Sequence, residues 1–180
     1  MTQDELRLAA QLAEQMAARW YAPLCAAMEL YEITTPARTA AFIAQTGHET
    51  LGFALTQELW GPTASQNAYE PPGRKAAALG NTQAGDGYRF RGRGLIQITG
   101  RANYQACGKA LSVDLLNHPD LLASDLAAHS AAWWWHAHGC NAIADSGDFE
   151  ALTRRINGGL NGIDDRLRRW GIAKLHCAGK

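Results

Sequence analysis

The stretch AAFIAQTGHETLGFALTQE, residues Ala40–Glu58, decides the fold of this chain. Its first half carries small and apolar residues at the spacing that predicts a helix. Upstream, Thr34 or Thr35 can serve as the N-cap, and Pro36 fits the first helical position, where its missing N–H costs nothing. Gly52 is a natural stop for the helix. We therefore predict a helix that begins at Pro36 and ends a few residues before Gly52.

Two carboxylates belong to the same stretch. Glu49 follows His48 in or near the last turn of the predicted helix, where the helix dipole and apolar surroundings favour the protonated carboxyl group. A carboxylic acid that stays protonated can act as a general acid. Glu58 lies nine residues further on. Such a pair suits hydrolysis of a glycosidic bond, in which one acid protonates the leaving oxygen and one base activates water. By itself, however, the pair is more typical of two solvated charges.

Composition places the chain among ordinary globular proteins, with 47% hydrophobic and 19% charged residues in 180. Its formal net charge of +0 gives no bulk attraction to nucleic acid or to a membrane surface. The N-terminus MTQDELRLAAQ is acidic and polar, unlike a secretory signal, and no apolar run is long enough to span a bilayer. We therefore expect synthesis in the cytoplasm, no stable membrane insertion and no nucleic-acid partner.

Helical patterns cover most of the remaining chain. A capping box at Thr2–Glu5 opens a helix whose apolar stripe reaches about Trp20, and Pro23 starts a short second helix. Four further helices are predicted from caps and apolar periodicity. They begin after Thr99 or Gly100, at Ser124, at Ser146 or Asp148, and near Ile163, and the last of them ends near Cys177.

The segment from Trp60 to Gly94 is rich in glycine and proline, which indicates a long loop of functional importance. Within it, Asp86-Gly87 predicts the turn of a small hairpin with strands at 88–91 and 95–99. Arg89, Arg91 and Arg93 would share one face of such a strand and could bind phosphates. Because the net charge is zero, a structural role or contact with an anionic polymer fits these arginines better. The sequence thus predicts a mainly α fold with a small β element.

No metal site is predicted. His48-Glu49 begins like H-E-x-x-H, but Gly52 replaces the second histidine. His136, His138 and Cys140 are spaced so that their side chains diverge on a helix, and no second cluster completes a site, so the histidines are best interpreted as lying at a helix end. The adjacent tryptophans Trp133, Trp134 and Trp135 cannot all lie on one helix face, so at least one is expected in the core.

The four cysteines form no C-x-x-C motif, so we expect them to be free thiols. They are Cys25, Cys107, Cys140 and Cys177.

Three blocks resemble glycoside hydrolase family 19, the chitinase-like branch of the lysozyme-like folds. They are FIAQTGHET (Phe42–Thr50), YRFRGRGLIQITGRANY (Tyr88–Tyr104) and INGGLNGIDDR (Ile156–Arg166), and the resemblance extends over about residues 36–175. The compact size and the loop ELWGPTASQNAYE are similar to the bacteriophage and prophage endolysins of that family. The resemblance implies an α+β, lysozyme-like fold in a single domain over residues 1–180, with N-terminal helices from residues 1–35 packed on it and the long loop beside the catalytic cleft.

The resemblance also implies roles for the two carboxylates. Glu49 matches the general acid of the family. Glu58 matches the general base, although the intervening segment is shorter than in plant chitinases, and Glu70 is a second candidate. Enzymes of this family invert the anomeric centre in a single displacement and need no metal or cofactor.

The remaining matches are polar residues of the substrate groove. Thr99 stands where a serine is common and keeps a hydroxyl group that could position the water. Arg166 matches a helix arginine tied to the catalytic acid, with Arg169 as the alternative. The expected substrate-binding residues are His48, Gln97, Thr99, Asn103, Tyr104, Asn157 and Arg166.

The sequence and the resemblance together predict a β-1,4-glycosidase acting on the glycan strands of bacterial peptidoglycan. We expect a monomeric endolysin, made in the host cytoplasm and released by a holin to act at the cell wall or periplasm. A chitinase is the alternative with the same residues, disfavoured because no export signal or chitin-binding module is recognised. A catalytically inactive wall-binding or nucleic-acid-binding module is the alternative of another class. Which glycosidic bond is cut stays open.

Overall fold

The computed structural model describes residues 1–178. The chain divides into two compact units. Unit 1 comprises Met1–Ala54 together with the chain from Ala132 onward, and unit 2 comprises Leu55–Ala131. The single-domain organisation expected for residues 1–180 stays a prediction.

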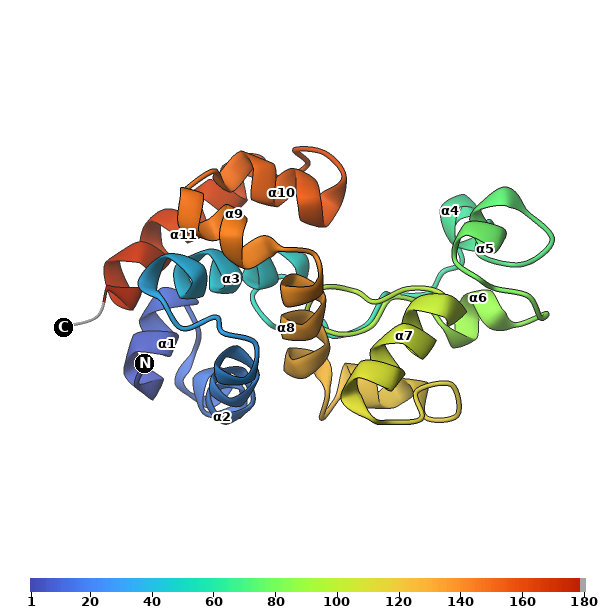
Figure 1. Cartoon of the computed structure of the whole chain (residues 1–180), viewed down its shortest axis with the longest axis horizontal. Coiled ribbons are helices and arrows are strands. Elements are labelled where there is room, and N and C mark those ends of the chain that lie inside the picture. Colours follow the sequence, from blue (N-terminus) through green and yellow to red (C-terminus); the bar gives the residue numbers. More distant parts are fainter. Residues whose placement is uncertain (179–180) are drawn as a thin grey trace. The chain divides into compact units, whose positions relative to one another are not determined.

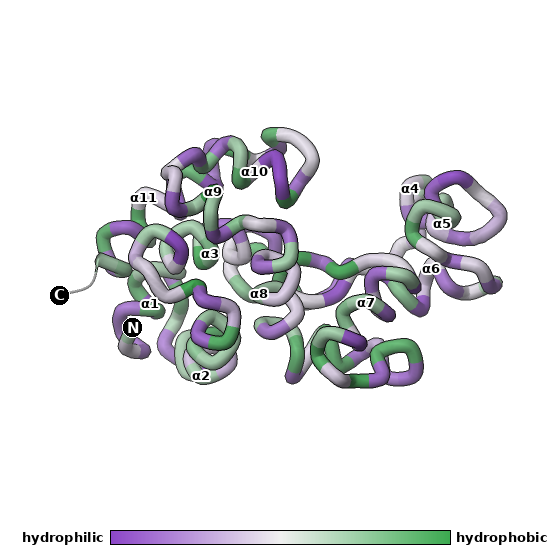
Figure 2. The backbone as a smooth tube through the Cα atoms, viewed as in Figure 1, coloured by the Kyte–Doolittle hydropathy of each residue, from purple (hydrophilic) through white to green (hydrophobic). Residues whose placement is uncertain are grey.

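The described residues are mainly helical, as predicted, and Figure 1 labels the α-helices. The segments are α1 (Gln3–Ala9), α2 (Glu14–Leu30), α3 (Pro36–Glu49), α4 (Ala64–Asn67), α5 (Arg74–Ala78), α6 (Asp86–Arg89), α7 (Arg101–Leu111), η1 (Pro119–Ala123), α8 (Ala127–Ala137), α9 (Cys140–Ser146), α10 (Phe149–Asn157) and α11 (Ile163–Cys177). Hydrophilic and hydrophobic residues alternate along helices such as α7 and α10 in Figure 2, the pattern of helices with one buried face.

Helix α3 is the centre of unit 1 and confirms the prediction for its sequence. The Thr35 side chain accepts a hydrogen bond from the Arg38 backbone N–H at 3.3 Å, and Pro36 occupies the first turn. The helix ends at Glu49, and Gly52 has a positive φ of 76° just beyond it. Helix α11 packs along α3, and α1 packs on α11 and α2, so the N-terminal segment is part of unit 1 (Figure 1).

The N-terminal helices differ from the prediction in their boundaries. Helix α1 already ends at Ala9, and the break includes Gln11 with a positive φ of 56°. Helix α2 continues through Pro23 instead of starting there. Trp20 and Leu24, on either side of the proline, are both buried. Burial of this apolar face outweighs the ~3 kcal/mol that a proline costs within a helix.

The predicted hairpin at 86–99 is wrong. Residues Asp86–Arg89 form the short helix α6, and among the described residues the antiparallel pairing is limited to isolated bridges, Gln57 with Arg93 and Arg93 with Ile98. The Asp86 carboxylate accepts hydrogen bonds from the backbone N–H groups of Thr82 and Gln83 at 2.8 and 3.0 Å. Such side-chain bonds satisfy the backbone locally and favour a helical turn over a hairpin.

Asp86 also carries a stability prediction. Burial of Asp86 opposes its ionisation, but hydrogen bonds from Arg101, Gln83 and Thr82 outweigh burial and lower its pKa from 3.8 to about 2. We expect Asp86→Asn to lower the free energy of unfolding by about 2 kcal/mol at neutral pH, because Arg101 loses its buried anionic partner. A pKa lowered by folding stabilises the fold above pH ~4, and this stabilisation is lost as the pH falls toward ~2.

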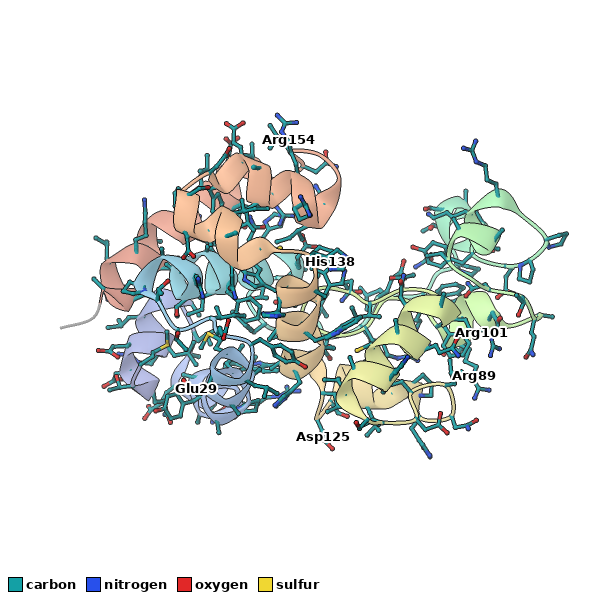
Figure 3. All side chains as sticks on the ribbon, in the orientation of Figure 1. Glu29, Arg89, Arg101, Asp125, His138 and Arg154 are labelled. Atoms are coloured by element: carbon teal, nitrogen blue, oxygen red, sulfur yellow. The ribbon has the colours of Figure 1, made fainter. Side chains whose placement is uncertain are left out.

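Urea unfolding of wild type and variant across this pH range measures the effect. The difference between the two proteins should shrink at low pH. Asp125→Asn is the matched control, because Asp125 is an exposed aspartate of unit 2 (Figure 3). A pH-independent difference would show that the carboxylate charge is not what stabilises this turn.

The tryptophans and cysteines follow the sequence prediction. Trp135 is buried and meets Phe42 edge-to-face with ring centroids 5.3 Å apart. All four cysteines are free, and burial raises the pKa of Cys107 and Cys140 to about 12. Within residues 1–178, no helix combines the length and hydrophobicity needed to cross a bilayer.

Candidate active site

The ion pair of Glu49 with Arg166 is the centre of the polar cluster in unit 1. Glu49 is the last residue of α3, and Arg166 lies in the first turn of α11. The Arg166 Nη2 donates to Glu49 Oε1 at 2.5 Å, and the arginine side chain is buried, with only 2% of it exposed. The other oxygen, Oε2, has no hydrogen-bond partner among the described residues, so Glu49 keeps one oxygen free.

The structure places Arg166 against Glu49, whereas Arg169 bonds Asp165. It also corrects the expectation that Arg166 contacts substrate. Its remaining donors bind Gln45 Oε1 and, at 3.1 Å, the Asn161 carbonyl, so the buried guanidinium positions Glu49.

Gln45 extends the cluster and is a residue that sequence reasoning missed. It is fully buried one turn before Glu49, binds Arg166, and donates to Thr153 Oγ1 at 2.8 Å. Residues four apart lie on the same face of a helix. The spacing of Gln45 and Glu49 is therefore the sequence signal that these two side chains lie together. A buried amide with both ends bonded fixes the direction of the arginine.

His48 lies beside this cluster. Its Nδ1 is 2.8 Å from Asp165 Oδ2, and a Cβ at Gly162 would overlap the imidazole ring, so only glycine fits there. Partial burial raises the pKa of Asp165, but hydrogen bonds from Arg169, His48 and Arg168 outweigh it and hold that pKa well below its usual range. The His48 side chain is 24% exposed, so its role in substrate binding stays a prediction that its accessibility allows.

Asn157 closes α10 beside the glycine turn. Its Nδ2 donates to the Asn161 carbonyl at 3.4 Å, the same carbonyl that accepts from Arg166. Gly158 follows with a positive φ of 75°, as the predicted helix end requires. The partly exposed Asn157 stays a predicted substrate-binding residue, tied through one carbonyl to the arginine that holds Glu49.

We expect Arg166→Met to lower the free energy of unfolding by about 3 kcal/mol, because Gln45 and Glu49 lose a buried charged partner. Chemical denaturation with circular dichroism measures the change. Arg154→Met is the control in the same unit, since Arg154 is 58% exposed and its N–O distance to Glu150 is 3.8 Å. Such exposed pairs contribute about 0–1 kcal/mol. Equal losses in the two variants would contradict the role given to Arg166.

In unit 2, Glu58 is held by neutral donors. Its Oε1 accepts from Gln66 Nε2 at 3.0 Å and from the Tyr69 hydroxyl at 3.4 Å, and its Oε2 accepts from the Gly92 N–H at 3.1 Å. Partial burial and the Glu58 charge both raise the pKa of Tyr69, so its hydroxyl stays protonated and donates. These hydrogen bonds hold both oxygens of Glu58 in fixed positions.

Sequence reasoning also missed Gln66. This side chain is 4% exposed, forms a capping box with Thr63, and bonds the Leu59 carbonyl at 2.8 Å as well as Glu58. The signal was the T-x-x-Q pattern in the middle loop, which marks a helix N-terminus. The short helix α4 therefore lies inside the predicted loop and positions Glu58.

Glu70, the second candidate base, binds the backbone of unit 2 with both carboxylate oxygens. Its Oε2 accepts from the Gly85 N–H at 2.9 Å and its Oε1 accepts from the Tyr88 N–H at 3.3 Å. A Cβ on Gly87 would lie 2.7 Å from Glu70 Oε1, so the backbone closely approaches this carboxylate. Glu70 therefore organises the start of α6, and Glu58 is the better candidate for catalysis.

The predicted groove residues of unit 2 gather around Gly92, whose N–H binds Glu58. A Cβ on Gly92 would lie 2.5 Å from Gln97 Oε1 and 3.2 Å from Thr99 Oγ1. Thr99 donates to the Gln97 carbonyl at 3.0 Å, and Asn103 Nδ2 donates to the Thr99 carbonyl at 2.7 Å. The structure thus brings Gln97, Thr99 and Asn103 together beside the peptide group that contacts Glu58.

Tyr104 is a correction to the predicted substrate-binding set. It is fully buried, its hydroxyl donates to the Arg91 carbonyl at 2.6 Å and accepts from Arg93 Nη1 at 2.9 Å. Both hydrogen-bonding functions of the hydroxyl are used inside unit 2. The side chain supports the fold and leaves no surface for a polymer.

The described residues contain no cluster of three or more histidine, cysteine, aspartate or glutamate side chains that could hold a metal ion. His138 follows α8 directly and stacks on Trp134 at 3.9 Å between ring centroids. The interpretation of His136 and His138 as helix-end residues is therefore confirmed.

Comparison with known proteins agrees with the predicted family. A sequence profile described as chitinase class I, glycoside hydrolase family 19, matches residues 15–163. A family 19 domain-containing protein of Haemophilus influenzae is 38% identical over 173 residues, covering 82% of this chain and 84% of the relative. Endochitinase 2 of Gossypium hirsutum is 41% identical over 110 residues, or 58% of this chain, and the match spans only 36% of that plant protein.

Solved structures show the same fold. Chitinase C of Streptomyces griseus has a TM-score of 0.75 at 21% identity, covering 99% of this chain and 77% of that chain. A bacterial family 19 chitinase has a TM-score of 0.71 at 25% identity, covering 99% of this chain and 95% of that chain. The chain therefore belongs to glycoside hydrolase family 19 and is a chitinase-like glycoside hydrolase.

Proposed function

We propose that this chain hydrolyses the β-1,4 bonds of bacterial peptidoglycan by a single inverting displacement, with Glu49 as general acid and Glu58 as general base. The observation that carries the assignment of roles is the contrast between the two carboxylates. Glu58 accepts hydrogen bonds on both oxygens from neutral donors, which fix the position of the carboxylate that would take a proton from water. Glu49 is anchored through Oε1 alone, leaving Oε2 to deliver a proton.

The proposed reaction is a single displacement with two carboxylates. Glu49 protonates the oxygen of the departing sugar while Glu58 removes a proton from water, which attacks the opposite face of the anomeric carbon. The hydroxyl of Thr99 and the amides of Gln97 and Asn103, gathered near Gly92, would orient the water and the sugar. Neutral groups can hydrogen-bond sugar hydroxyls without adding charge beside the acid.

The biological role in this proposal is that of an endolysin. The enzyme would be made in the host cytoplasm, act as a monomer, and reach the glycan strands of the wall after release by a holin. The support is the likeness of its motifs to phage and prophage endolysins, together with the bacterial relative of which the match spans 84%.

Chitin is the second candidate substrate. It is favoured by the similarity to endochitinases of plants and to a bacterial family 19 chitinase. The residues and the mechanism would be unchanged, because chitin shares the β-1,4 linkage and the N-acetyl groups. The two proposals differ only in which polymer is cleaved.

Mass spectrometry of the products separates these candidates. Purified peptidoglycan and soluble chitin oligosaccharides are digested in parallel, and the new reducing ends are identified. Reducing-end N-acetylmuramic acid or N-acetylglucosamine from peptidoglycan would support the proposal and also identify the bond. Cleavage of chitin alone would establish a chitinase and remove the support for an endolysin. Absence of cleavage in both would favour a non-catalytic wall-binding module.

A further inference from the structure

Unit 2 contains a hollow of about 560 Å³ that the proposed reaction does not use. Its walls come from the turn before α6, from α6 and the segment after it, from the start of α7, and from η1 with the loop before it. None of the groove residues around Gly92 lines it. Its size is within the range of ligand-binding pockets.

The lining of this hollow is strongly basic. Four arginines and two aspartates contribute to it, namely Arg89, Arg91, Arg93, Arg101, Asp86 and Asp120. Arg101 pairs with Asp86, and Arg93 pairs with Asp120, whereas Arg89 and Arg91 have no ion-pair partner within residues 1–178. Two positive charges are therefore uncompensated at one hollow in a chain whose formal net charge is +0.

Arg89 is the residue best placed to bind an anion. Its Nη2 donates to the Leu116 carbonyl at 2.8 Å, which fixes the guanidinium on the loop before η1. Its other N–H groups have no hydrogen-bond partner in the described part of the chain, and the residue is exposed. Figure 3 shows it beside Arg101, which lines the same hollow. A guanidinium held in one orientation with free N–H groups is well suited to a carboxylate.

The same hollow offers an acceptor for a cation. Asp120 receives a hydrogen bond from Arg93 Nη2 at 2.7 Å on Oδ1, but its side chain is 82% exposed. The second oxygen has no partner among the described residues. Asn117 and Gln83 add amide groups to the lining. The hollow therefore presents guanidinium donors and an exposed carboxylate together, a combination that complements a zwitterion better than a dianionic phosphate.

We propose that this hollow binds the peptide stem of peptidoglycan, with Arg89 holding a stem carboxylate and Asp120 accepting a free stem ammonium group. The inference rests on the proposed function, since it concerns the same polymer at a second site. Chitin is a neutral homopolymer without carboxylates or peptides. A site for the stem would let the enzyme distinguish peptidoglycan from chitin although both carry the same linkage.

The test uses the full chain and the free tetrapeptide L-Ala-γ-D-Glu-diaminopimelate-D-Ala, which contains no glycosidic bond. Isothermal titration calorimetry measures its affinity for wild type, Arg89→Ala and Arg74→Ala. Arg74 is the matched control, because it is an exposed arginine of unit 2 that does not line the hollow. We expect about a tenfold loss of affinity for Arg89→Ala, the effect of losing a charged hydrogen bond, and no change for Arg74→Ala.

A second measurement does not depend on any variant. In wild-type protein, the tetrapeptide should shift the backbone NMR signals of residues 83–93 and 117–120, and inorganic phosphate should not displace it. No binding, equal affinity of Arg89→Ala, or displacement by phosphate would overturn the inference. Cleavage of peptidoglycan without tetrapeptide binding would leave the proposed function standing and refute this site alone. Arg89-dependent binding of the tetrapeptide supports the site, whichever polymer is cleaved.

Discussion

Replacing Glu49 by glutamine should reduce kcat on the cleaved polymer by about 10³-fold, the scale of a lost general acid. The amide cannot protonate the leaving oxygen. Its carbonyl oxygen can still accept the hydrogen bond from Arg166 that Glu49 Oε1 accepts now. Substrate binding should persist, so the loss is expected in kcat and not in KM. Initial rates of reducing-end release measure the effect.

The control for this variant is Glu150→Gln. Glu150 is an exposed glutamate of unit 1, with its side chain 60% accessible. Its variant should retain wild-type turnover. Thermal unfolding by circular dichroism should show that Glu49→Gln remains folded. Turnover close to wild type in a folded Glu49→Gln protein would remove Glu49 from the reaction.

Glu58→Gln should also reduce kcat severely, by about 10²-fold, because the attacking water loses its general base. The three donors that hold Glu58 come from Gln66, Tyr69 and the Gly92 backbone. An amide satisfies only part of this arrangement, since its NH₂ group cannot accept from a donor. Some loss of stability is therefore expected in addition to the loss of turnover, and both are measured on the same preparation.

Glu70→Gln is the decisive comparison for the base. Glu70 accepts two backbone N–H groups, so its variant should lose stability while keeping most of its turnover. If Glu58→Gln were nearly as active as wild type and Glu70→Gln were inactive while folded, the base assignment would pass to Glu70. The two variants differ in position but not in chemistry, which makes the comparison specific.

Local rules predicted the helices that carry their own end signals. Thr35 and Asp148 cap α3 and α10 with their side chains, and Gly158 closes α10 in the left-handed conformation. The same rules failed where distant residues decide the conformation. Glu70 accepts from the Gly85 backbone N–H just before α6, and Arg101 donates to Asp86, the first residue of α6, each from 15 residues away. These contacts favour a helix over the predicted hairpin.

The candidate site shows a similar division. Glu49 and Glu58 were identified by their spacing and by the family motifs, but the contact of Glu49 with Arg166 joins residues 117 apart in the chain. No local pattern encodes such a contact, so only the resemblance pointed to it. Tyr104 shows the opposite error, because membership of a motif does not reveal that a side chain is buried.

The most direct test of the single-displacement reaction is the anomeric form of the first product. Proton NMR recorded during the initial phase of digestion distinguishes the two anomers before they equilibrate in water. Glu49 and Glu58 acting on one bond with an intervening water predict that the α anomer appears first from a β-1,4 linkage. Initial release of the β anomer would require a covalent intermediate and would contradict the assignment of Glu58 as a base.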